Sequence, residues 1–293
     1  LSLASCGQKT TTDDPVAAAT LAESYQNYLD TAEPSYAYDI ALELTTNPEY
    51  FNAEQGGRNA GSDAEHAAAD YLVGVMKDIG LADVEKQAAQ CDRWQFNSAS
   101  LTIDGKDYNV YTYATASTPA EGLTAEVVYV NKGTRQDYEG LDVTGKIVLL
   151  DIDQRNDWWI TYPMLEAMHQ GAVGVLAANV GGFAQIADDA LNSQDICGPV
   201  GIPTLSIGVA DAKEIQEKLK AGSVSATMKV DNEVEIDAGT TYNITGVLKG
   251  KSSDHQILVG GHYDVHFQGF QDDNCAVGLV LAMANAMVKS GYQ

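Results

Sequence analysis

The sequence predicts an α/β protein in which a β-rich segment interrupts a chain of helices and strands. Three observations predict this: an amphipathic helix at Asp63–Ile79, short apolar strands between about 95 and 236, and an apolar strand followed by an Ala-rich helix near the end. A chain of 293 residues exceeds one average domain and favours two. We therefore expect a leader and tether at 1–32, an α/β domain split into 33–94 and 237–293, and an insert at 95–236.

The first α/β part is predicted from one strong helix. Its apolar positions recur at helical spacing, at Ala68, Leu72, Val75, Met76 and Ile79. Ser62 or Asp63 is suited to the N-cap and Gly80 to the C-cap. Shorter helical patterns at about 15–30 and 37–44 precede it, and a strand is expected at Val84–Ala88.

The insert is predicted from three apolar runs at Gly145–Asp151, Gly171–Leu176 and Ile202–Ile207, which have the composition of buried strands. Helices are expected between and after them, at Tyr162–Gln170 and Asp211–Ala221. Further strands of the insert are expected from shorter runs, at Ser100–Ile103, Tyr108–Tyr113 and Thr124–Val130, and a strand at Thr240–Leu248 is expected in the α/β part that follows it.

The charge and the cysteines exclude several classes of protein. The formal charge is -24, from 41 acidic and 17 basic side chains, which argues against nucleic acid or an anionic membrane surface as a partner and favours small cationic substrates. The four cysteines form no C-x-x-C pair, which argues against a cysteine-type structural zinc site. No run of about 18 apolar residues is present to span a membrane.

The first six residues, Leu1 to Cys6, resemble the lipobox of a bacterial lipoprotein signal. Small residues precede Cys6, and a polar Ser/Thr/Asp-rich stretch follows it, as an anchored globular domain requires. We expect Cys6 to carry the lipid and to provide the only membrane contact, so the protein would be extracytoplasmic. The alternative is a chance cysteine in a leader.

The residues that carry chemistry lie near the C-terminal end. His262 follows the apolar strand Ile257–Gly260, and Asp264 lies two residues on, on the same face of an extended segment. A metal-ligating histidine usually donates its second N–H to a carboxylate, a role that suits Asp264. Asp272 and Asp273 follow a short loop, directly before the helix Val277–Val288. A strand-end histidine with a capping aspartate is the alternative.

The stretch Ile257–Met287 resembles the co-catalytic zinc aminopeptidases of the aminopeptidase Y and bacterial leucyl-aminopeptidase type, which are related to glutamate carboxypeptidase II. The resemblance implies a zinc-exopeptidase (phosphorylase/hydrolase-like) α/β/α sandwich with two zinc ions. It implies that His262 binds one zinc, that Asp273 bridges both, and that Asp264 supports His262, with Asp272 outside the ligand set. It also implies a cis peptide after the bridging residue, at Asp273–Asn274. The three apolar runs of the insert resemble the strands of a protease-associated (PA) domain.

The resemblance further implies a Glu-Glu pair that supplies the general base, another acidic ligand and a second histidine, all beyond Gln293. We therefore expect a C-terminally truncated fragment with half of a metal site. The leading hypothesis is an aminopeptidase acting on peptides. A carboxypeptidase, a glutaminyl-cyclase-like relative and a PA binding module on an inactive peptidase scaffold are the alternatives. His266 is expected at the rim of the site and Cys275 as a small buried residue.

Overall fold

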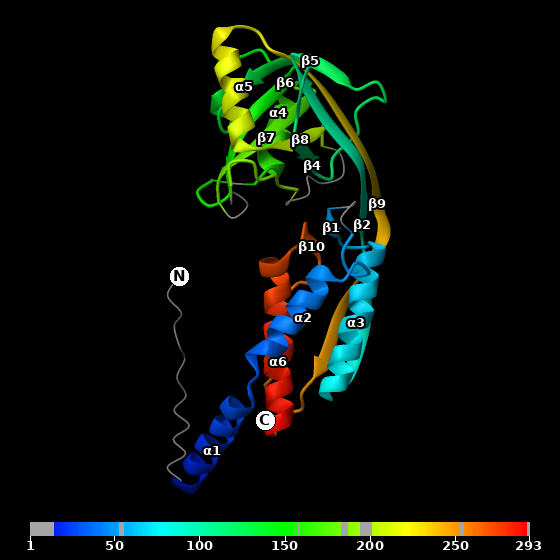
Figure 1. The fold of residues 1–293 in the computed structure, drawn as a ribbon, viewed down its shortest axis with the longest axis vertical. Helices are drawn as coiled ribbons and strands as arrows, with labels where there is room; N and C mark the ends of the chain where they lie inside the picture. The colour runs from blue at the N-terminus through cyan, green and yellow to red at the C-terminus, as the bar shows by residue number, and fades with distance from the viewer. Residues whose placement is uncertain are drawn as a thin grey trace.

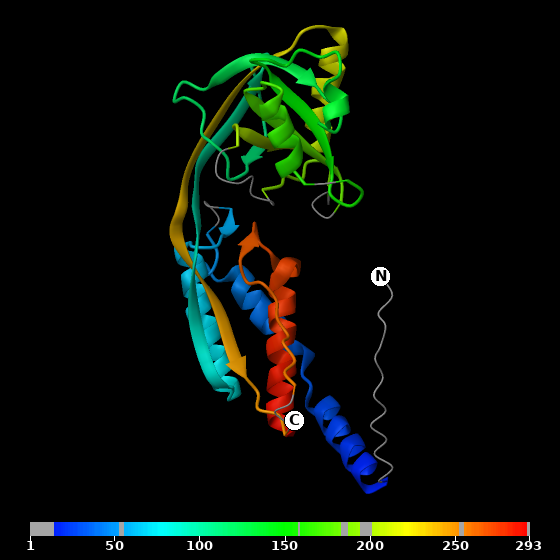
Figure 2. The ribbon, with the colours of Figure 1, turned by 180° about the vertical axis from the view of Figure 1, so that it is seen from behind.

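The computed structural model describes residues 15–52, 56–157, 159–182, 187–193, 201–251 and 255–291, with side chains from residue 23 onward. Cys6 and its leader lie outside the described residues. The described chain forms an elongated molecule with a β-rich part at one end and a helical part at the other (Figure 1). A long two-stranded ribbon joins the two parts, as the view from behind also shows (Figure 2).

The elements follow the chain in this order: α1 Pro15–Thr31, α2 Pro34–Thr46, β1 Gly57–Arg58, α3 Asp63–Ile79, β2 Ala82–Ile103, β3 Lys106–Tyr108, β4 Val110–Thr112, β5 Leu123–Tyr129, a 3-10 turn Arg135–Tyr138, β6 Ile147–Asp153, α4 Thr161–His169, β7 Gly174–Gly181, β8 Thr204–Ile207, α5 Val209–Ala221, β9 Ser225–Val247, β10 Val265–His266, a π-type turn Phe270–Asn274 and α6 Cys275–Ser290.

The ribbon is made by β2 and β9, which pair antiparallel from Ala82↔Val247 to Ile103↔Ala226. The strands predicted at Val84–Ala88 and Ser100–Ile103 are present as parts of β2, and the one predicted at Thr240–Leu248 ends β9, so the prediction is wrong only in their length. Polar residues in the middle of these strands do not end them, because the ribbon is exposed there and the pairing continues through register shifts at three places. The expected segment boundaries at 95 and 236 fall inside β2 and β9, and the division into segments stays a prediction.

The β-rich part is built on a sheet of order β3-β2-β9-β5-β6-β7-β8-β4, in which β5 to β8 are parallel. Successive residues of β6 pack on opposite faces. Ile147 and Leu149 join the core that includes Ile215 of α5, and Val148 and Leu150 join the core of α4. Because helices cover both faces, residues 147–150 of β6 and 175–178 of β7 are apolar and buried on both faces, as expected from the sequence.

In the helical part, α2, α3 and α6 pack together beside the end of the ribbon at Ala82 and Val247 (Figure 1). Its apolar core joins residues from all of these elements: Ile40, Leu44, Ala68, Leu72, Ile79, Val277 and Leu281, with Ile244 packed against them. Gly278 allows α6 to approach α2 closely, because a Cβ there would meet the carbonyl oxygen of Ala37. The predicted caps of α3 are confirmed: the side chain of Ser62 accepts from the Glu65 amide, and Gly80 is left-handed.

The strand expected at 256–260 is not formed. Residues 255–264 form no ladder with any described strand, and the side chains of Ile257 and Leu258 are 90% and 95% exposed. Apolar composition alone does not make a strand, because each backbone group also needs a neighbouring strand to bond to. Among the described residues, none of the helices combines the length and apolarity needed to cross a membrane.

Candidate metal centre

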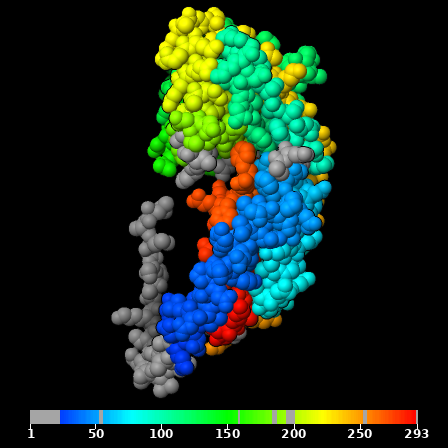
Figure 3. All heavy atoms as spheres, viewed as in Figure 1, coloured from blue at the N-terminus to red at the C-terminus, as the bar shows by residue number. Residues whose placement is uncertain are grey.

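The candidate centre is carried by two backbone segments that meet at the N-terminal end of α6. The first is 262–264, followed by β10, and the second is the π-type turn Phe270–Asn274. Strand β10 pairs with β1 through Gly57↔His266 and Arg58↔Val265, which fixes the first segment to the helical part. The space-filling view shows this orange segment at the surface, where the two parts of the molecule meet (Figure 3).

The imidazole of His262 is held through both ring nitrogens. Its Nδ1 lies 2.9 Å from the carbonyl oxygen of Asp264 and 3.2 Å from Asp264 Oδ1. Its Nε2 lies 3.0 Å from Asp272 Oδ1. Since Nδ1 donates to Asp264, a close approach of Nε2 to a carboxylate requires a proton or another cation between them. The predicted contact between His262 and Asp264 is present.

The two aspartates of the turn have different partners. Asp272 faces Nε2 of His262, whereas Oδ2 of Asp273 accepts the backbone N–H of His262 at 3.3 Å. Gly261 is needed beside Asp273, because a Cβ at Gly261 would lie 3.0 Å from that same Oδ2. A cis peptide is present, but it joins Asp272 and Asp273, so its expected place at Asp273–Asn274 is wrong by one residue. The turn places Asp272, which the sequence analysis leaves out, at the ring nitrogen that a metal would use.

The surrounding acids change the pKa of His262. Partial burial lowers this pKa, but the Asp264 carbonyl and carboxylate, with Asp272 and Asp273, outweigh burial and raise it above its ordinary value. The centre therefore favours positive charge at His262 and at its Nε2.

An imidazole nitrogen and a carboxylate oxygen are the donor types that zinc accepts in catalytic sites. His262 and Asp272 fit such an ion as two of its ligands. Within the described residues, no group of three or more His, Cys, Asp or Glu side chains is arranged to hold a metal. The donor set is thus suited to zinc in chemistry and incomplete in number over the part of the chain that the structure describes.

A buried arginine ties the two segments together. Arg58 has no exposed surface, and its Nε donates to the carbonyl of Tyr263 at 2.6 Å while Nη2 donates to Asn274 Oδ1 at 2.5 Å. Its Nη1 donates to the carbonyls of Leu44 and Tyr50 at 2.7 and 2.6 Å. Burial lowers the pKa of Arg58 to about 10, and the charges of nearby carboxylates oppose that shift. No pattern in the sequence predicts this role for Arg58.

Tyr263, between His262 and Asp264, is anchored on the other side of the segment. Its hydroxyl contacts Oε1 of Glu65 and lies 2.9 Å from the carbonyl oxygen of Tyr242. Glu65 is fully buried in α3 and also accepts from Thr241 Oγ1 at 3.2 Å. Burial raises the pKa of this carboxyl group. Alternate residues of the segment therefore point to solvent and to the core, as in a strand.

His266 points away from the metal centre. Its Nδ1 lies 3.3 Å from Ser193 Oγ, and its ring centroid is 6.5 Å from that of Trp94. Cys275 is a free thiol with a half-buried side chain at the first position of α6. Neither contacts His262.

Comparison with known proteins identifies the insert. A family model described as the PA domain matches residues 123–215, from β5 to the first half of α5. Probable leucine aminopeptidase 2 of Aspergillus fumigatus is 29% identical over 234 residues, which cover 78% of this chain and 44% of the relative. The resemblance to the zinc aminopeptidases with a PA domain is confirmed.

Two other relatives are named as a carboxypeptidase and as a lipoprotein aminopeptidase. Carboxypeptidase Q of Bos taurus is 26% identical, with 74% of this chain and 48% of the relative covered. Probable lipoprotein aminopeptidase LpqL of Mycobacterium tuberculosis is 24% identical, with 80% and 45% covered. The chain thus spans about half the length of the curated relatives it matches.

Solved structures confirm the α/β peptidase fold. A peptidase M28 precursor from Shewanella amazonensis superposes with a TM-score of 0.75 at 23% identity, covering 92% of this chain and 64% of that one. The zinc aminopeptidase BSAP from Bacillus subtilis gives a TM-score of 0.64 at 25% identity, covering 87% and 58%.

Proposed function

We propose that this chain belongs to a zinc-dependent exopeptidase that releases N-terminal amino acids from peptides. The observation that carries the proposal is the geometry of His262, whose Nδ1 is fixed by Asp264 while Nε2 faces Asp272. This is the arrangement expected of a metal-ligating histidine with a supporting carboxylate. The resemblance to zinc aminopeptidases in sequence and fold agrees with it.

In the proposed site, His262 and one carboxylate of the Asp272–Asp273 pair would hold zinc. The contact to Nε2 favours Asp272 for this role, and Asp273, expected from the resemblance, is the alternative. When bound, zinc polarises a carbonyl and lowers the pKa of a water. Asp264 keeps the proton of His262 on Nδ1, and Arg58 holds the two ligand segments in register.

The PA domain, proposed to span 95–236, lies beside this centre and would shape access for peptides. We also propose an extracytoplasmic location with a lipid on Cys6, which the relative named as a lipoprotein aminopeptidase supports. Metabolic labelling with palmitate tests the anchor. The label should be lost in Cys6→Ser, and its retention in that variant would reject the anchor at Cys6.

Carboxypeptidase activity is the second candidate, because one similar relative is named a carboxypeptidase. The test uses the full gene product that carries this chain, loaded with zinc. We expect chelator-sensitive release of an amino acid from an aminoacyl anilide, and little release from a peptide with a blocked N-terminus. The reverse pattern would favour the carboxypeptidase. Zinc binding without hydrolysis of either substrate would favour a glutaminyl-cyclase-like relative or an inactive PA binding protein.

The ligand assignment has its own control. His262→Ala should reduce the zinc content and abolish release, while Cys275→Ala, at a neighbouring position outside the donor set, should change neither. An active His262→Ala protein with unchanged zinc stoichiometry would reject His262 as a ligand.

A further inference from the structure

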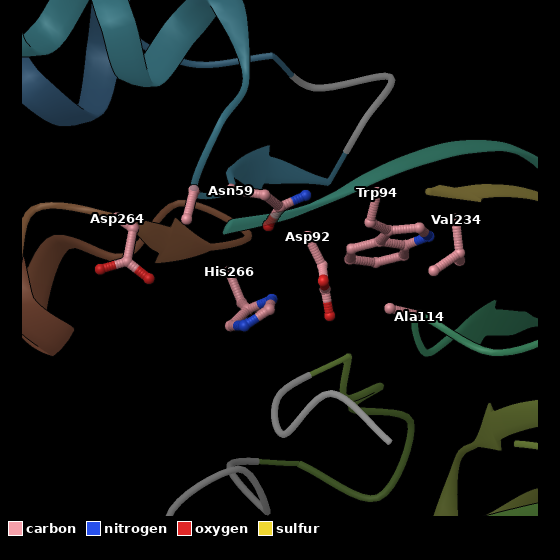
Figure 4. Close-up of a pocket in the computed structure, with 8 residues that line it drawn as sticks. Asn59, Asp92, Trp94, Ala114, Val234, Asp264 and His266 are labelled. Atoms are coloured by element: carbon pink, nitrogen blue, oxygen red, sulfur yellow. The ribbon is translucent and has the colours of Figure 1, made fainter. Parts of the chain in front are cut away.

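A small pocket lies directly beside the metal centre, on the side of His266. Its volume is about 70 Å³, enough for roughly five water-sized groups at the ~10–15 Å³ that each requires. It collects side chains from five separate segments: Asn59, Ala60, Asp92, Trp94, Ala114, Val234, Asp264 and His266. The close-up shows Asp92 between His266 and Trp94, with Asn59 above them (Figure 4). Asp264 belongs both to this pocket and to the support of His262, so the two sites share a wall.

Asn59 is the feature that indicates a ligand. Its side chain is only 5% exposed and faces the pocket, yet neither Oδ1 nor Nδ2 has a hydrogen-bond partner in the structure. A buried polar group without a partner costs about 1–3 kcal/mol. Buried polar groups in folded proteins are nearly always satisfied by a protein group, an ordered water or a bound ligand, so the pocket side of Asn59 is a site for one of the last two.

The charged side chains that line the pocket favour a positively charged ligand. Asp92 and Asp264 contribute two carboxylates, and the lining contains neither lysine nor arginine. Arg58, next to Asn59 in sequence, uses its guanidinium on the backbone carbonyls and on Asn274, away from the pocket. An anion would meet two like charges here, and an apolar group would leave the buried side chain of Asn59 without a partner.

The remaining lining is apolar and suits a short alkyl chain. Trp94, Ala114 and Val234 form this wall. The indole Nε1 of Trp94 already donates to Asn232 Oδ1 at 3.1 Å, so this residue offers its ring face to the ligand. A cation near an indole face gains about 0.5–2 kcal/mol.

We propose that this pocket binds the alkylammonium side chain of a lysine residue in the peptide substrate. The inference rests on the proposed exopeptidase function and adds a substrate preference to it. The ammonium group donates to Asn59 Oδ1 and to the carboxylates of Asp92 and Asp264, and the methylenes lie against Trp94 and Val234. A water that joins the ammonium satisfies Asn59 Nδ2. The side chain then enters from the direction of the metal centre, because Asp264 borders both.

The first test is equilibrium binding, which does not depend on hydrolysis. Nα-acetyl-lysine methylamide and its norleucine analogue are titrated into the zinc-loaded full gene product by calorimetry, at about pH 8, above the ordinary histidine pKa. We expect the lysine compound to bind about tenfold more tightly, a difference of about 1.4 kcal/mol. Equal binding of the two compounds would overturn the proposal.

Variants then locate the effect. Asn59→Leu should reduce the lysine preference at least about fivefold, since one acceptor is lost from a buried site. Asp92→Asn tests the same pocket from an exposed residue, and its side-chain oxygen still accepts the Asp237 amide that Asp92 accepts at 2.9 Å. The fold should therefore tolerate this change even where Asn59→Leu does not. The control is Glu121→Gln, which removes one exposed charge in a turn outside the pocket.

The outcomes separate the possibilities. If Asp92→Asn lowers the lysine preference about threefold and Glu121→Gln leaves it unchanged, the pocket is the source of the preference. If both variants lower it equally, the net charge of the protein is the source and the pocket assignment is wrong. Release rates from lysyl and norleucyl peptides supply the second readout. If neither peptide is hydrolysed but the lysine analogue still binds selectively, the proposed function fails while the pocket assignment stands.

Discussion

The apolar core of the PA domain and the segment 257–264 that carries His262 are held in place by different kinds of interaction. In β6, residues 147–150 are fully buried, with helices on both faces of the sheet. In the metal-centre segment, the side chain of His262 is 53% exposed, and Ile257 and Leu258 lie almost fully in solvent. The β6 strand is fixed by apolar packing and by strand pairing along its length. The His262 segment is fixed by a few strong hydrogen bonds.

The difference shows which interactions matter in each region. A packed core distributes its stabilisation over many contacts, so each residue contributes a part. The ligand segments depend on one guanidinium that bonds to four partners. The first prediction therefore concerns Arg58.

Replacing Arg58 by methionine should produce the largest effect. Methionine fills a similar volume but leaves three carbonyl oxygens and the Asn274 side chain without their donor, in a site with no access to water. Each unsatisfied group costs about 1–3 kcal/mol, and removing the buried charge offsets part of that total. We therefore expect the free energy of unfolding to fall by about 4 kcal/mol. Hydrogen exchange followed by mass spectrometry should show the loss in α2, β10 and the start of α6, with protection in β6 unchanged.

The matched control is Arg93→Met. Arg93 is half exposed and pairs at 3.5 Å with the equally exposed Glu235, and such pairs contribute less than about 1 kcal/mol. If Arg58→Met costs no more than Arg93→Met, the ligand segments are held by something other than this guanidinium.

The second prediction tests the PA core. Leu149→Ala removes a fully buried side chain of β6 and should cost about 3 kcal/mol, because the lost burial and the new cavity add. Ile257→Ala removes a similar side chain from solvent and should stay within about 0.5 kcal/mol. Both are measured by urea denaturation of the same protein, with exchange rates to assign each loss to its region. A large cost at Ile257 would mean that this segment is packed in solution.

The same contrast decides how much of the molecule could be predicted from sequence. The strands of the PA domain were predictable because neighbouring residues such as Leu149 and Leu150, which lie on opposite faces of the sheet, are both apolar and buried. Helix α3 was predictable to its ends, because Ser62 and Gly80 act locally as caps. Local patterns describe these elements well, since each is determined by its own residues.

The metal centre was predictable only in part. The H-x-D pattern gives the contact between His262 and Asp264, because two residues apart on an extended chain share a face. It does not give the assignment of Asp272 and Asp273, which depends on the conformation of one turn. It also does not give the role of Arg58, whose partners Tyr263 and Asn274 lie more than 200 residues away in the chain. A buried arginine leaves no periodic pattern, and only its place before a turn could have marked it.

The third prediction separates the two aspartates. Asp272→Asn should weaken zinc binding by about 30-fold, close to 2 kcal/mol, because a charged oxygen next to Nε2 of His262 is lost. Asp273→Asn should weaken it by only about threefold, since an amide oxygen can still accept the His262 N–H. Competition with a fluorescent chelator measures both affinities. The opposite order would return the bridging role to Asp273.

The smallest effect is expected at Glu65, where the ligand segment touches the core of α3. Burial raises the pKa of Glu65 in the folded state, so the folded protein binds this proton more tightly than the unfolded chain does. Its contribution to stability is therefore greatest below the unfolded pKa of about 4.5 and is lost as the pH rises through the folded pKa. Glu65→Gln keeps an oxygen for the hydroxyl groups of Tyr263 and Thr241 but cannot ionise. We expect this variant to gain at most about 1 kcal/mol at pH 7 and to show a flatter stability profile above that unfolded pKa. Denaturation at a series of pH values compares the stability of the two proteins. If the wild-type stability instead rises with pH relative to Glu65→Gln, the hydrogen bonds of the carboxylate stabilise its charged form more than burial destabilises it.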